Sequence, residues 1–143
     1  MMILLSALAM AASAPQRIDI TPELIADLPR QEVTLTHHDE SLRCDGPLLA
    51  DVVAKAGVPS GESVRGPALR TAVVARAADG YSVLFSLGEI DPRLGNGTII
   101  LADRCDGKTL DSATGPYRLA IPGDKRGARS VRQLIALEIL SID

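Results

Sequence analysis

The strongest chemical signal in the sequence is a basic segment near the C-terminus, GDKRGARSVR. Gly123 and Gly127 allow backbone N–H groups to turn toward an anion, and arginine suits two-point contact with phosphate. The segment therefore predicts an anion-binding loop, and the alternative is a solvated basic loop partly neutralised by Asp124. The basic residues of this segment are Lys125, Arg126, Arg129 and Arg132.

Two cysteines, Cys44 and Cys105, each begin a Cys-Asp-Gly sequence. In an oxidising compartment, two cysteines in one small protein indicate a disulfide. The sequence leaves two alternatives open: both thiols are free and buried, or Cys44 contacts a metal.

The segment His37-His38-Asp39-Glu40 offers metal-ligand types side by side. Adjacent residues of a strand point to opposite faces, so one strand does not aim both imidazoles at one ion. We expect exposed loop histidines, one of which could face a ligand pocket.

Length and composition limit the classes of function. The 143 residues suit one domain, and 46% of them are hydrophobic, which argues against disorder. The net charge is −3 and only 2% of the residues are aromatic, so bulk attraction to nucleic acid and base stacking are not expected.

The N-terminus is apolar and ends in small residues, as in a secretory signal peptide, although no basic residue precedes the apolar run. We therefore expect a signal peptide over residues 1–14 and a mature domain over 15–143. The protein is then periplasmic or secreted, with no membrane span in its mature part.

The elements that must position these residues are mostly strands. Gly46-Pro47 begins the clearest predicted helix, which Gly57 ends, and a brief helix follows Thr21. Helical turns are expected at 87–90 and 129–133. This pattern predicts an α+β fold with a mostly β core. Alternating or Val-rich segments predict strands at 16–20, 32–36, 69–76, 81–85, 98–102 and 117–121, with 134–142 favoured as a strand although its periodicity also allows a helix.

Three segments, in this order, resemble the oxidoreductase molybdopterin-binding domain family. They are CDGPLLADVVAKAGVP from Cys44, ARAADGYSVLFSLGEID from Ala75, and GPYRLAIPGDKRGARSVRQLIALEI from Gly115. The resemblance implies a compact, strand-rich, sulfite-oxidase-like α+β domain. It also implies a molybdopterin cofactor and oxygen-atom-transfer chemistry, and Tyr81 could then line the pocket. By the same resemblance, the cofactor phosphate would contact Arg126, Arg129, Ser130 and Arg132.

The sequence departs from that family where its enzymes carry the metal-binding cysteine. The corresponding region, from Val33 to Arg43, contains histidines but no cysteine, and Cys44 is displaced from the ligand position. We therefore favour a non-catalytic or accessory module that binds a small anionic ligand or a protein partner, such as a periplasmic redox protein. The alternatives are a genuine molybdenum oxidoreductase, with the metal held by the dithiolene alone or by Cys44, and a structural envelope protein without a ligand.

Overall fold

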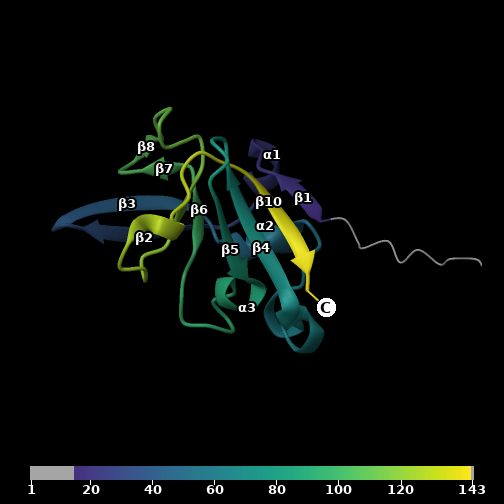
Figure 1. Cartoon of the computed structure of the whole chain (residues 1–143). Helices are drawn as coiled ribbons and strands as arrows, with labels where there is room; N and C mark the ends of the chain where they lie inside the picture. The colour runs from purple at the N-terminus through teal and green to yellow at the C-terminus, as the bar shows by residue number, and fades with distance from the viewer. Residues whose placement is uncertain (1–14, 143) are drawn as a thin grey trace, which may run out of the picture.

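The computed structural model describes residues 15–142 and shows a strand-rich α+β protein, which confirms the predicted class (Figure 1). The signal peptide expected over residues 1–14 lies outside the described residues. The strands are β1 (Gln16–Asp19), β2 (Arg30–His37), β3 (Glu40–Pro47), β4 (Thr71–Ala77), β5 (Ser82–Ser86), β6 (Ile100–Ala102), β7 (Arg104–Cys105), β8 (Lys108–Thr109), β9 (Arg118–Ala120) and β10 (Leu134–Ser141). The helices are α1 (Pro22–Ile25), α2 (Leu49–Lys55) and α3 (Leu87–Ile90), with 3-10 turns η1 (Gly61–Ser63), η2 (Gly66–Arg70) and η3 (Gly127–Arg129).

One antiparallel sheet has the strand order β1-β10-β4-β5. One face of this sheet packs on the hydrophobic core, where the side chains of Val73, Phe85 and Leu137 are buried. Helix α2 contributes Leu49, Val52 and Val53 to the same hydrophobic core. These apolar side chains therefore form the core-facing side of that helix.

A second sheet has the order β2-β3-β7-β8 and is dominated by the β2–β3 hairpin, which extends from the body of the protein (Figure 1). The hairpin turn places His38 and Asp39 at positive φ. Strand β7 pairs with β3 so that Cys44 and Cys105 lie directly opposite, and their sulfur atoms form a disulfide.

A two-stranded ribbon, β6–β9, links the two sheets. Leu119 of β9 faces the main core, whereas Ala120 and Ile100 belong to a smaller cluster with Leu35 and Cys44 of the hairpin. The backbones approach closely at Gly46, where an added Cβ would lie 2.0 Å from the carbonyl oxygen of Leu101. A glycine is therefore required where β3 passes β6.

One expectation about the first half of the chain is wrong, and another is met in part. Gly46 and Pro47 do not begin the helix, because β3 continues through Pro47 to pair with β2, and α2 begins at Leu49. Both histidines are exposed as expected, but only His38 lies outside the strands: His37 ends β2, and His38 begins the tight turn that leads to β3. Ladder pairing along the whole hairpin outweighs the local helix-start signal.

Among residues 15–142, no helix has the length and apolar character needed to cross a bilayer.

Candidate functional site

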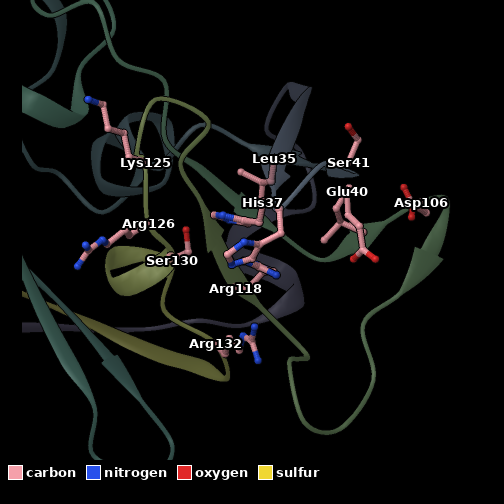
Figure 2. Close-up of a pocket in the computed structure, with 13 residues that line it drawn as sticks. Leu35, His37, Glu40, Ser41, Asp106, Arg118, Lys125, Arg126, Ser130 and Arg132 are labelled. Atoms are coloured by element: carbon pink, nitrogen blue, oxygen red, sulfur yellow. The ribbon is translucent and has the colours of Figure 1, made fainter.

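A cavity of about 1050 Å³ lies between the β2–β3 hairpin and the loop that joins β9 to β10 (Figure 2). The hairpin supplies one wall, and the loop with strand β9 supplies the other. The lining residues are Leu35, His37, His38, Glu40, Ser41, Leu42, Asp106, Arg118, Lys125, Arg126, Gly127, Ser130 and Arg132.

Arg118 is the buried charge of this cavity. It lies on β9, opposite Ala102 of β6, and its residue is only 7% exposed. Its Nε donates to the carbonyl oxygen of Leu119 at 3.3 Å, and no other hydrogen bond or ion pair of this side chain is found within residues 15–142. A buried guanidinium normally has a carboxylate or phosphate partner, because taking its charge out of water is costly.

The surroundings of Arg118 oppose its positive charge instead of balancing it. Burial lowers the pKa of the Arg118 guanidinium, and the positive charge of Arg132 lowers it further. An arginine nevertheless stays protonated in a protein. Two guanidinium groups that line one cavity, and that form no ion pair with any acid among residues 15–142, suit the binding of an oxyanion.

The β9–β10 loop is closed at its base by backbone hydrogen bonds. Leu119 N–H donates to Val131 O at 2.9 Å, and Leu134 N–H donates to Tyr117 O at 2.9 Å. This closure holds the segment 122–130 against the mouth of the cavity, where the single turn η3 lies.

Three of the four residues predicted to contact an anion line the cavity: Arg126, Ser130 and Arg132. Ser130 is buried, whereas Arg126 and Arg132 are exposed. Figure 2 shows these residues and Lys125 around the side of the cavity that faces away from the hairpin turn.

The fourth predicted residue, Arg129, is not among the lining residues. Its Nε and Nη2 donate to Asp124 at 2.9 and 2.8 Å, and its Nη1 donates to Glu89 at 2.9 Å. These partners raise the pKa of Arg129, with the Asp124 hydrogen bonds contributing most. Arg129 therefore connects the β9–β10 loop to α3 through Glu89. Glu89 also forms a capping box with Ser86 at the start of that helix.

Tyr81 is a second anchor of the same loop and does not line the cavity. Tyr81 is the residue before β5 and is about half exposed. Its hydroxyl donates a hydrogen bond to the carbonyl oxygen of Ala128. The expectation that Tyr81 lines the pocket is therefore not met. Tyr81 instead contacts the β9–β10 loop, which forms one wall of the pocket.

His37 and His38 are both exposed and both line the cavity. His37 lies against the loop: a Cβ at Gly127 would be 3.9 Å from its Nε2. In Figure 2 the side chains of His37 and Arg118 are both drawn among those that line the cavity. Within the described residues there is no group of three or more His, Cys, Asp or Glu placed to hold a metal.

The acidic residues of the cavity come from the hairpin side. Glu40 begins β3, and Asp106 lies in the β7–β8 turn, where its carboxylate accepts a hydrogen bond from Arg43 N–H at 3.0 Å. In Figure 2 both carboxylates lie on the side of the cavity opposite Arg126.

The disulfide decides between the alternatives for the cysteines. Cys44 is fully buried and bonded to Cys105, so it offers no thiolate to a metal at this cavity.

Arg118 is the residue that sequence reasoning missed. Its signal is a single charge inside the apolar strand YRLAI, residues 117–121. Period-two alternation places Tyr117 and Leu119 on one face and Arg118 on the other, so a buried charge could be suspected once the strand was known to lie inside the fold.

The sequence matches no model of a known protein family, and no curated protein was found to be significantly similar to it.

Proposed function

We propose that this chain is a non-catalytic or accessory module that binds a small organic anion in the cavity between the β2–β3 hairpin and the β9–β10 loop. The observation that carries the proposal is Arg118: it is buried, has no acidic partner among residues 15–142, and faces the cavity together with Arg132. A bound oxyanion supplies the missing negative charge.

The dimensions and walls of the cavity favour an organic ligand over an inorganic ion. Its volume of about 1050 Å³ is at the upper end of ordinary small-molecule sites. Leu35 and Leu42 give the hairpin wall an apolar surface. A ligand with an anionic head and a larger organic body fits both features.

The resemblance to molybdopterin-binding domains suggests what such a ligand could be. Arg126, Ser130 and Arg132, which that resemblance assigns to the cofactor phosphate, line the cavity. The residues present therefore suit the phosphate of a pterin cofactor. They do not suit thiolate ligation of a metal, because Cys44 is in a disulfide, and this supports a role without metal chemistry.

A molybdenum oxidoreductase of the sulfite oxidase type is the second candidate. The three loop residues on the cavity favour it, and the metal would then depend on the dithiolene sulfur atoms of the cofactor. Elemental and pterin analysis of protein from a molybdenum-replete host separates the candidates: stoichiometric molybdenum supports the enzyme, whereas absence of molybdenum, with or without bound pterin, supports the accessory module.

An exported location is part of the proposal. The apolar N-terminal segment 1–14 suggests secretion, and the Cys44–Cys105 disulfide agrees with an oxidising compartment.

The central test uses Arg118→Met, which keeps the apolar stem and removes the charge. Thermal unfolding is measured with and without hexyl phosphate. We expect the wild-type protein to be stabilised, since a ligand at one hundred times its Kd stabilises the folded state by about 2.7 kcal/mol. Arg118→Met should bind at least about tenfold more weakly, because a buried charge contact is lost.

The same variant distinguishes a binding role from a structural one. Removing an unpaired buried charge should leave the free protein equally stable or more stable, whereas loss of a structural arginine would destabilise it. Arg65→Met is the matched control, because Arg65 is exposed and outside the cavity. Equal hexyl phosphate affinity in both variants would refute the proposed site and favour a protein without this ligand.

A further inference from the structure

The positively and negatively charged residues of the cavity lie on different walls. All cationic residues of the lining come from β9 and from the loop and segment that follow it, and both carboxylates come from the hairpin and the β7–β8 turn. Figure 2 shows the same separation, with Glu40 and Asp106 on one side and Arg126 and Lys125 on the other. The cavity is therefore electrostatically bipolar.

These charges do not neutralise one another. Within residues 15–142, none of the ion pairs involves Glu40, Asp106 or any cationic residue of the lining. Elsewhere many of the charges are paired, as Arg30 is with Asp45 and Arg129 is with Asp124. Opposite charges that face one cavity without meeting leave room for a ligand to contact both.

The carboxylate wall has free acceptor capacity. Asp106 uses Oδ1 to accept from Arg43 N–H, and Oδ2 has no partner among the described residues. Glu40 makes no side-chain hydrogen bond within the same part of the chain, and its residue is exposed next to the hairpin turn. An ammonium or amidine group can use these oxygen atoms, whereas an anion is repelled by them.

The buried Arg118 makes this more than a cluster of surface acids. Its unpaired guanidinium faces the same cavity and fixes where the anionic end of a ligand must lie. The opposite wall is then left for a group of the opposite charge.

From this arrangement we infer that the ligand is an amphoteric molecule, with an oxyanion at one end and a nitrogen group at the other. Arg118 and Arg132 hold the oxyanion. Glu40 and Asp106 hold the nitrogen group, which is cationic or a strong hydrogen-bond donor. The inference rests on the proposed function and adds the second recognition group.

The test compares ω-aminoalkyl phosphates with alkyl phosphates of equal chain length, from four to eight carbons, by isothermal titration calorimetry. The alkyl phosphate measures the anion site alone. At the chain length that spans the cavity, the amine should tighten binding by about twofold to fivefold, as expected for an exposed ion pair.

The double variant Glu40→Gln/Asp106→Asn should abolish this preference while leaving alkyl phosphate affinity equal or greater, because repulsion from the two carboxylates is removed. Glu62→Gln is the matched control, since Glu62 is exposed and outside the cavity. Circular dichroism checks that the variants fold.

The two proposals fail in different ways. If no alkyl phosphate of either series binds, the anion site itself is wrong. If both series bind equally at every chain length, or if the double variant keeps the preference for the amine, the anion site stands and the amphoteric ligand is wrong.

Discussion

The guanidinium carbon of Arg129 lies 5.2 Å from the centre of the Phe85 ring, while its nitrogen atoms bind Asp124 and Glu89. Phe85 is fully buried in β5, so this contact joins the β9–β10 loop to the main sheet. Arg129 therefore positions the wall of the cavity without lining it.

Replacing Arg129 with Met should destabilise the protein by about 1 to 2 kcal/mol, through loss of a two-point ion pair and a cation–π contact at a partly exposed site. Urea unfolding measures the change, and amide exchange of the loop should become faster. Arg126→Met is the control, because Arg126 makes no ion pair with any residue in 15–142 and its loss should leave stability unchanged. Equal stability of the two variants would contradict the anchoring role.

The sequence predicted the local elements better than the partners of their side chains. Thr21 caps α1 by accepting from Leu24 N–H at 3.2 Å, as its position before Pro22 indicated. The basic segment was recognised, but the use of Arg129 was not, because Glu89 lies 40 residues away and reaches it only through the packing of α3 against the loop. Local chemistry can be read from local sequence, whereas a long-range ion pair requires the fold.

The β2–β3 hairpin shows the same limit. Period-two alternation predicted a strand over 32–36, but pairing extends it to the full range of β2. The Gly46-Pro47 sequence resembled a helix start, and only the approach of β6 explains the glycine. Tertiary contact therefore outweighed a strong local signal at this point.

Gly46 gives a prediction about this contact. Gly46→Ala would place a Cβ 2.0 Å from the backbone oxygen of Leu101, and backbone on both sides leaves no flexible side chain to move aside. We expect a loss of about 3 kcal/mol or more in the free energy of unfolding. Gly97→Ala is the control, since nothing lies within 4 Å of its added Cβ. Chemical denaturation of both variants tests this, and a change below about 1 kcal/mol in Gly46→Ala would exclude the close packing of β3 on β6.

The disulfide gives a prediction about both stability and the cavity. Cys44 and Cys105 are 61 residues apart, and closing such a loop stabilises the folded state by about 4 kcal/mol in the chain-entropy model. We therefore expect Cys44→Ala/Cys105→Ala to lower the free energy of unfolding by about that amount. Because Asp106 follows Cys105 directly, amide exchange in the β7–β8 turn should also increase.

Mass spectrometry after alkylation checks the bond itself. Protein unfolded without reductant should carry no label on Cys44 or Cys105, and protein unfolded with reductant should carry two. Labelling of both cysteines without reductant would refute the disulfide and reopen the alternative of free thiols.

Asp91 carries the last prediction, which concerns pH. It is 1% exposed and accepts hydrogen bonds from Gly61 N–H at 2.7 Å and Arg93 N–H at 2.9 Å, so it joins the η1 turn to the segment after α3. Burial alone would raise the pKa of Asp91, but these hydrogen bonds and the charge of Arg93 hold it below its ordinary value of 3.8.

Because the folded state binds this proton less tightly than the unfolded state does, the stabilisation from Asp91 is complete above pH 3.8 and is lost as pH falls through the lowered pKa. Asp91→Asn should lower the free energy of unfolding by about 1 to 3 kcal/mol at neutral pH. The reason is that the asparagine side chain replaces one carboxylate oxygen with an NH₂ group, which cannot accept the hydrogen bond from Gly61 N–H. The stability difference between wild type and Asp91→Asn, measured by urea unfolding from pH 7 to pH 2, should therefore shrink below about pH 4. Glu62→Gln, at an exposed position, is the control and should differ little from wild type in stability at every pH. If the stability difference between wild type and Asp91→Asn stays constant across the whole range, these hydrogen bonds do not hold the carboxylate ionised.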